Sequence, residues 1–235
     1  TYTVGTGGDF ASLTNAGGFF QTLNNLGASA NITANIISDL SSESGANVLN
    51  PVSGGFSVLI RPAGDTRVVT GSSAAGLIVL NGADNVTIDG SLAGGSAGPT
   101  VGGDASLRRL IFNNTATATT SGVIHVSTGT DGLGAQNVTL RNLNVFGQDP
   151  TQTLIGIAVG GTTLGTVGAD NDNLVIENCA VRRALFGIYA AGASAANPNT
   201  GNVIRRNDLT GLGVDRIRRV GILVFNQDGI VISEN

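Results

Sequence analysis

Carboxylates offer the widest choice of chemistry in this sequence. Hydrolysis of a glycosidic bond needs two of them, one to protonate the leaving oxygen and one to activate water. Asp149, Asp170, Asp172 and Asp208 would have to come together from separate segments, because the chain contains no Asp-Asp dipeptide. The sequence therefore assigns no catalytic residue.

Two of these carboxylates, Asp170 and Asp172, lie in the segment GADNDN (168–173). Several oxygen ligands in one loop suit calcium, but the same residue types are also the commonest turn formers. A calcium site and an ordinary turn both stay open at this point, and we assign no metal ligand and no cofactor.

The one histidine and the one cysteine lie in short apolar segments. His125 in GVIHVS faces solvent if Ile124 and Val126 point inward, and faces the core if the strands that begin with glycine share one frame. A catalytic role would need a partner side chain, and none is evident. Cys179 is expected to be a buried free thiol rather than a nucleophile.

All 12 basic residues are arginines. Most are adjacent pairs, at 108–109, 182–183, 205–206 and 218–219. The guanidiniums at 182, 205 and 218 could gather with Glu177, Asp208 and Asp215. This group would be either a surface network joining neighbouring repeats or a groove for an anionic glycan. Tyr189 is expected to face outward, where it could stack on a sugar ring.

A repeated strand must position these residues. The variants are DNVTIDG (84–90), QNVTLRNLNV (136–145), DNLVIENCAV (172–181), GNVIRRNDL (201–209) and GIVISEN (229–235). Their central apolar residues, together with one from LRRLIFNN, are Ile88, Phe112, Leu140, Ile176, Ile204 and Ile232, spaced 24 to 36 residues apart. Such a period predicts a solenoid or a similar array.

Most repeats contain a second strand that opens with glycine. These strands are GLIVLNG (76–82), GVIHVS (122–127), GIAVGG (156–161), GIYAAG (187–192) and GILVFN (221–226). We predict a coil of parallel strands that rises about 4.8 Å per turn and stacks like apolar side chains inside. The column Asp89, Arg141, Glu177 and Arg205 is expected to face outward into solvent.

An asparagine follows most of the repeated strands: Asn114, Asn142, Asn178, Asn207 and Asn235. We expect these amides to point inward and to bond to one another and to the backbone of the turn. The asparagine comes two residues after the central apolar position in three repeats and three residues after it in the last two. The offset indicates either a bulge or an error in the assumed register.

The first 75 residues differ from the rest. The segment 9–27 has a helical apolar stripe, with Asp9 as its expected N-cap and Gly27 as its expected end. Such a helix would plug the open end of the coil. We expect one domain over 1–235, with a cap and irregular first coils in 1–75 and regular coils in 76–235. The chain is expected to continue past Asn235 or to dock there on another subunit.

Composition excludes several classes of protein. Hydrophobic residues make up 41% of the chain and charged residues only 12%, with 36 glycines and a net charge of −4. No basic stripe indicates nucleic-acid binding, and no apolar run is long enough to span a membrane. The profile is typical of many short strands joined by tight turns.

The segments YTVGTGGDFASLTNA and LIVLNGADNVTIDG and the later N-x-x-I-x-N units carry a resemblance that covers nearly the whole chain. The sequence resembles right-handed parallel β-helix proteins of the pectate-lyase-like superfamily, of the kind found in large bacterial secreted or cell-surface proteins. The resemblance implies an all-β, single-stranded right-handed parallel β-helix with an N-terminal capping α-helix. The enzymes that it resembles mostly cleave acidic polysaccharides.

We expect a non-catalytic structural or adhesive module of a secreted bacterial surface protein that binds polysaccharide or cell-surface glycans. The hydrolases that it resembles use aspartates with a nearby Gly-His-Gly segment, and the lyases use calcium with an Arg or Lys base. This chain has neither Gly-His-Gly nor lysine. Two alternatives stay open: a polysaccharide lyase or glycoside hydrolase, or a fragment of one, and a fibre subunit that associates end to end.

Overall fold

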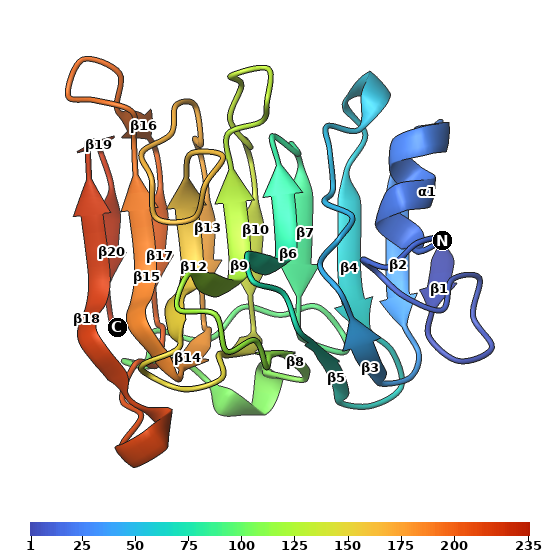
Figure 1. Cartoon of the computed structure of the whole chain (residues 1–235), viewed down its shortest axis with the longest axis horizontal. Coiled ribbons are helices and arrows are strands. Elements are labelled where there is room, and N and C mark those ends of the chain that lie inside the picture. Colours follow the sequence, from blue (N-terminus) through green and yellow to red (C-terminus); the bar gives the residue numbers. More distant parts are fainter.

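The computed structural model covers residues 1–235 and consists mostly of parallel β-strands, with one short α-helix (Figure 1). Every pairing between named strands of the large sheets is parallel, and each sheet is open. None of the helices has the length and apolarity that a membrane crossing requires.

Three large sheets and one small sheet contain the strands. The first sheet has eight, in the order β1 (Tyr2–Val4), β2 (Ile32–Ile36), β4 (Val58–Pro62), β7 (Val86–Asp89), β10 (Thr139–Arg141), β13 (Val175–Glu177), β17 (Val203–Arg205) and β20 (Val231–Ser233). The second has five: β14 (Ala180–Arg182), β11 (Leu143–Phe146), β8 (Leu110–Asn114), β5 (Arg67–Gly71) and β3 (Leu40–Glu43). The third also has five: β18 (Ile217–Phe225), β15 (Ala184–Ala191), β12 (Thr153–Gly160), β9 (Ser121–Ser127) and β6 (Gly76–Asn81). The small sheet pairs β16 (Asn199–Thr200) with β19 (Gln227–Asp228), and the 3-10 helices are η1 (Ser53–Gly55), η2 (Ala105–Leu107) and η3 (Gly213–Asp215).

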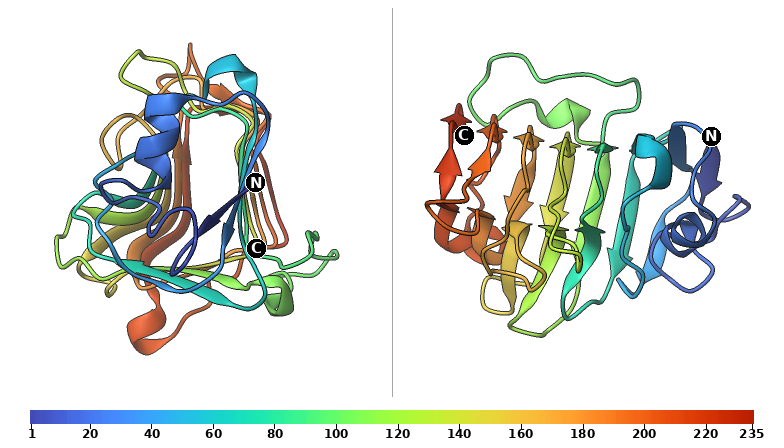
Figure 2. Two further views of the ribbon diagram at one scale, coloured as in Figure 1. Left: turned by 90° about the vertical axis from the view of Figure 1, so that its right-hand side faces the viewer. Right: turned by 90° about the horizontal axis from the view of Figure 1, so that it is seen from above.

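The chain visits the three large sheets in a repeating order. From β4 to β15 it passes through the first, second and third sheets in turn, and we call each such passage a circuit. Seen end on, the circuits lie behind one another around a common interior (Figure 2, left). A cluster of 37 buried apolar residues fills that interior. Like residues therefore pack on like residues from one circuit to the next.

Register confirms most of the predicted alignment. The pairs in the first sheet are Ile88 with Leu140, Leu140 with Ile176, Ile176 with Ile204, and Ile204 with Ile232. The glycine-led strands pair with one another, and Ile78, Ile124, Ile157, Ile188 and Ile222 form one column of the third sheet. They do not share one frame, because the leading glycine lies two residues before this column in the first two strands and one residue before it in the other three. The placement of Phe112 in the first column is wrong, because it pairs with Val69 and Val145 in the second sheet.

Two regular circuits have a strand, β11 and β14, that the sequence analysis did not separate from the strand before it. β11 begins one residue after Asn142, which separates it from β10. Asn142 and Asn178 adopt left-handed backbone conformations, with φ of 59° and 53°, and asparagine tolerates this conformation better than most residues. One such residue turns the chain from the first sheet to the second without interrupting the apolar pattern. Two strands therefore read as one in the sequence.

The same left-handed position explains the asparagine offset. Arg206 and Glu234 take it in the last two circuits, with φ of 56° and 55°, so Asn207 and Asn235 come one residue later. The register is unbroken there, and no bulge is present. The predicted single ladder of asparagines is therefore wrong. Asn207 and Asn235 bond to each other, while Asn178 bonds to Asn142.

Asn114 lies outside both asparagine pairs. It is the last residue of β8, at another corner of the circuit, where its amide donates to the carbonyl oxygens of Ser73 and Gly122. It therefore satisfies backbone groups at a turn, as expected, but this turn connects the second sheet to the third.

The capping helix is shorter than predicted. α1 spans Phe19–Leu26, begins after Gly18 and ends at Gly27, whose φ is 69°. Asp9 does not cap it, because its carboxylate accepts hydrogen bonds from the backbone N–H and the hydroxyl of Thr3 at 2.8 and 2.9 Å. Phe19, Phe20 and Leu23 are buried and join the main core. The helix lies near the N-terminal end of the sheets (Figure 1).

Candidate functional site

A long connection between β7 and β8, residues 90–109, crosses the outside of the molecule; we call it the strap. It arches from the middle of the sheets toward the C-terminal strands (Figure 2, right). Its Gly95 carbonyl accepts from Asn142 at 2.8 Å, and its Ala97 carbonyl accepts from Arg206 at 2.7 Å. The Gly102 N–H donates to the Glu234 carbonyl at 2.9 Å. The strap therefore ties together circuits that are far apart in sequence.

The strap changes the environment of the charged column in the first sheet. Asp89, Arg141, Glu177 and Arg205 align in register as predicted. The prediction that this column is solvated is wrong for its carboxylates, because Asp89 is 2% exposed and Glu177 3%. Ser96 of the strap donates to Glu177 at 2.8 Å. Burial of these charges is tolerated because each is paired and hydrogen-bonded.

Ion pairs run between neighbouring circuits along this column. Arg141 binds Asp89 through Nη2 at 2.8 Å, and Arg205 binds Glu177 at 3.2 Å. Arg206 bridges Glu177 at 3.0 Å and Glu234 at 2.7 Å. Of the two sequence alternatives for the arginines, this arrangement matches the network that joins repeats.

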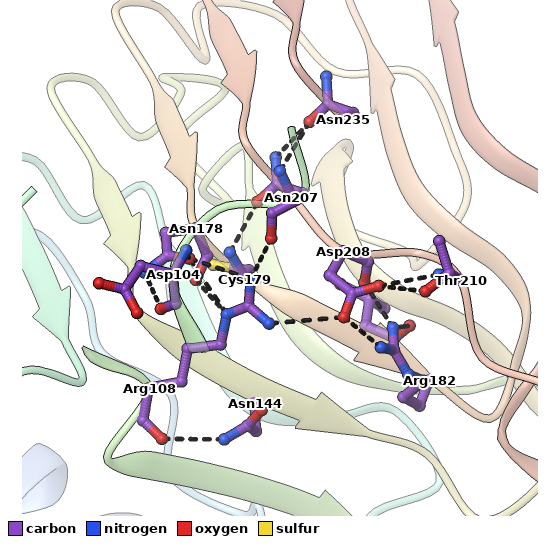
Figure 3. A network of polar contacts seen from close by, with 12 residues as sticks. Asp104, Arg108, Asn144, Asn178, Cys179, Arg182, Asn207, Asp208, Thr210 and Asn235 are labelled. Atoms are coloured by element: carbon purple, nitrogen blue, oxygen red, sulfur yellow. Dashed lines mark hydrogen bonds and ion pairs between the residues drawn. The ribbon is translucent and has the colours of Figure 1, made fainter. Parts of the chain in front are cut away.

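A second polar group lies beside the strap, around Arg108 (Figure 3). The Arg108 side chain is 4% exposed. Its Nε donates to the backbone carbonyl of Asn178 at 3.1 Å, and its Nη2 donates to the Asn178 side chain at 3.0 Å and to the Gly102 carbonyl. Nη1 lies 3.5 Å from Oδ2 of Asp208. Arg108 therefore anchors the returning end of the strap.

Asp208 is held by several donors. Oδ1 accepts from the backbone N–H and the hydroxyl of Thr210, and Oδ2 accepts from Arg182 at 2.5 Å. Partial burial alone would raise the pKa of Asp208, but the hydrogen bonds from Thr210 and Arg182 outweigh it and lower the pKa to about 2. Burial lowers the pKa of Arg108, and the charge of Asp208 opposes that shift. Both groups are charged at neutral pH.

The strap and the chain after β17 enclose a cleft of about 300 Å³. Val101, Ala105 and Arg108 line it from the strap, and Asp208 and Thr210 line it from the chain after β17. Val101 is 73% exposed. The cleft thus combines a charged donor, a charged acceptor, a hydroxyl and apolar methyl groups.

The remaining predicted arginines divide into two cases. Arg183 binds Asp215 at 2.6 Å and lies over the ring of Phe146. Arg218 and Arg219 are exposed on β18 and form no ion pair. The expected gathering of the guanidiniums at 182, 205 and 218 therefore does not form, because each lies on a different strand or loop with its own contacts.

Cys179 is fully buried, as predicted. Its backbone N–H donates to Asn207 at 2.9 Å. Burial raises the pKa of the thiol to about 12, so the reactive thiolate is not populated at neutral pH.

A second loop covers the outside of the third sheet; we call residues 161–168 the flap. Its Gly168 N–H donates to the Ala191 carbonyl at 3.1 Å. Leu164 packs over Gly122, where an added Cβ would lie 2.8 Å from the leucine methyl carbons. Leu164 belongs to an outer apolar cluster built on Ile155, Ala158 and Tyr189.

His125 lies beneath the flap. Ile124 and Val126 belong to the core, so His125 points outward, but it is only 3% exposed. Its Nε2 bonds with the Gly161 carbonyl at 3.0 Å. Burial lowers the pKa of His125 to about 4, against a smaller opposite effect of that hydrogen bond. Of the two orientations that the sequence left open, the structure shows the outward one, but the side chain is buried rather than exposed to solvent.

Tyr189 also points outward, as predicted, since Ile188 and Ala190 lie in the core. It is 7% exposed and its ring lies 6.2 Å from that of Phe225. Its face is therefore covered and does not offer a platform to a sugar.

The carboxylates of the hypothetical acidic groove bind to their own surroundings. Asp149 accepts from Thr151 and Gln152, and Asp172 accepts from the N–H of Thr200 at 2.6 Å. Asp170 takes a left-handed conformation with φ of 59°. No three His, Cys, Asp or Glu side chains converge in an arrangement that would hold a metal ion.

Sequence reasoning missed the strap and the role of Arg108. The available signal was the spacing from Ile88 to Leu140, which is far longer than the neighbouring steps once Phe112 is removed from that column. Comparison of the chain with protein-family models, curated proteins and solved structures finds no match.

Proposed function

We propose that the circuits form a right-handed, single-stranded parallel β-helix similar to that of the pectate-lyase-like superfamily. The repeated visiting order of the three sheets and the parallel pairing support this fold. The unbroken column from Ile88 to Ile232 supports it as well.

The function we propose on this fold is a non-catalytic structural and adhesive module of a secreted bacterial surface protein, with cell-surface glycans as its ligands. The observation that supports this proposal is that charged side chains form ion pairs between neighbouring circuits. Arg141, Arg205 and Arg206 each bind a carboxylate of a neighbouring circuit. Such bonds resist sliding of one circuit over the next, so the exposed loops keep a fixed spacing, which is what a scaffold for binding requires.

The titration of the carboxylates supports a scaffold over a glycosidase. A general acid for glycoside cleavage needs a raised pKa. The pKa of Asp149 is lowered by hydrogen bonds from Thr151, and that of Asp208 is also lowered. Both stay ionised at neutral pH.

The experiment is an assay of the purified chain on polygalacturonate, alginate and neutral polysaccharides. We expect no new reducing ends and no unsaturated products, together with retention of the chain on some immobilised polysaccharides. Cleavage that disappears in an Asp208→Asn or Asp149→Asn variant would overturn the non-catalytic assignment in favour of the lyase or hydrolase.

A fibre subunit is the second candidate. Phe225, Val231 and Ile232 are about half exposed on β18 and β20, which are edge strands of their sheets. Exposed apolar edges favour pairing with another chain. Sedimentation velocity over a range of concentrations decides, because a fibre subunit forms species of increasing size and a monomeric module does not.

A further inference from the structure

The cleft beside Arg108 has a polar composition that selects among ligands. Oδ2 of Asp208 and Nη1 of Arg108 are 3.5 Å apart, longer than a good N–H···O hydrogen bond. The other nitrogens of Arg108 are engaged by Asn178 and Gly102. Nη1 is thus the one nitrogen of a nearly buried guanidinium that keeps donor capacity on the side of the cleft.

Charge in the cleft disfavours ionic ligands. An anion that approached Arg108 would also meet the carboxylate of Asp208, and a cation that approached Asp208 would meet Arg108 and Arg182. A hydroxyl group suits both, because it accepts a hydrogen bond from Nη1 and donates one to Oδ2. Two neighbouring hydroxyls would bind the pair more completely than one.

The rest of the cleft fits the carbon skeleton of such a ligand. Val101 and Ala105 present methyl groups, and the oxygen of Thr210 keeps acceptor capacity while its proton is donated to Asp208. The volume of about 300 Å³ is at the lower end of ligand sites, enough for one sugar ring.

We propose that this cleft binds a neutral sugar unit through a vicinal diol, with Arg108 as donor, Asp208 as acceptor and the strap methyl groups against the ring. The site deepens the adhesive function proposed above and rests on it. It also assigns a role to the strap, which forms one wall of the cleft through Val101, Gly102 and Ala105.

The test is an NMR titration of the full chain with methyl β-galactopyranoside, methyl α-mannopyranoside and galacturonate at millimolar concentrations. We expect a neutral glycoside to shift the signals of Val101, Ala105 and Thr210, and galacturonate to bind more weakly than the neutral galactoside. Ala105→Gln fills the cleft from an exposed position and should weaken binding at least tenfold. Ala195→Gln, on an exposed loop after β15, is the matched control and should bind as the wild type does.

Absence of shifts with every sugar would overturn the site, as would tighter binding of galacturonate or equal binding by Ala105→Gln. Shifts confined to another face would overturn this site while leaving an adhesive function in place. Cleavage of polysaccharide would contradict the non-catalytic function instead, so the two failures are distinguishable. Unchanged amide signals in β9 and β12 would show that Ala105→Gln is folded.

Discussion

The strap and the flap cover the outside of two sheets with opposite chemistry. The strap lies over a charged column, where Ser96 donates to Glu177 and the strap backbone accepts from the adjacent Asn142 and Arg206. The flap lies over a mostly apolar column in which Val79, His125, Ala158, Tyr189 and Leu223 align in register. Each loop therefore matches the side chains beneath it.

The comparison shows that an outward position on a strand is not the same as an exposed position. Strand alternation decides which side chains leave the core. A long connection between strands then decides which of these outward side chains are covered and shielded from solvent. Under the strap this produces buried ion pairs, and under the flap it produces a buried neutral histidine.

The largest effect is expected from breaking the charged column. Glu177→Gln removes the charge that Arg205 and Arg206 share beneath the strap. Loss of one partner of a largely buried pair costs about 3 kcal/mol. Urea unfolding followed by circular dichroism measures it, and hydrogen exchange of residues 95–103 should increase. A loss below about 1 kcal/mol would show that the strap does not depend on this carboxylate.

Acid should destabilise the packing of the flap on His125. Unfolded His125 takes up a proton near pH 6.5 and folded His125 only near pH 4, so the stability that neutral His125 provides is complete above pH 6.5 and is lost as the pH falls toward 4. The loss is about 3 kcal/mol over that window, because the pKa of His125 falls from 6.5 in the unfolded chain to about 4 in the folded protein.

His125→Gln keeps an amide that can donate to the Gly161 carbonyl but cannot titrate. Chemical denaturation at pH 7 and pH 4 should show a smaller loss for this variant than for the wild type. Because the chain has one histidine, its ring signals report the folded pKa directly. A folded pKa near 6.5 would rule out the closed flap.

A steric change at the flap should have a moderate effect. Gly122→Ala places a Cβ 2.8 Å from the methyl carbons of Leu164 and 3.1 Å from the Ile155 carbonyl oxygen. Displacement of Leu164 should cost about 2 kcal/mol and expose the outer apolar cluster. Thermal unfolding and binding of an apolar dye measure both. The control Gly98→Ala lies on the strap in open space and should leave stability and dye binding unchanged.

The smallest effect is expected at an exposed pair of the strap. Arg109 binds Asp65 at 3.2 Å, with the two side chains 41% and 71% exposed. Arg109→Gln should therefore change stability by less than about 0.5 kcal/mol. A loss comparable to that of Glu177→Gln would mean that burial does not explain the difference between the two pairs.

Much of the repeat was predictable from the sequence, because identical strands must bury identical residues. The column of Leu140, Ile176 and Ile204 follows from the spacing of the repeat, and the outward direction of Tyr189 follows from strand alternation. The direction of His125 was left open, because it depended on the frame of the glycine-led strands. The separation of β11 from β10 and of β14 from β13 was not predictable, because one left-handed residue such as Asn142 turns the chain without altering the apolar pattern.

The sequence by itself determined the parallel strands, the inward columns and the burial of Cys179, since these depend on local periodicity. Tertiary structure alone decided where the strap and the flap lie. These two loops set the environments of Glu177, Arg108 and His125. Those environments could not be predicted from the sequence, because irregular loops carry no periodic signal and their contacts join residues up to 109 positions apart. The cleft beside Arg108 exists only where the strap meets the chain after β17.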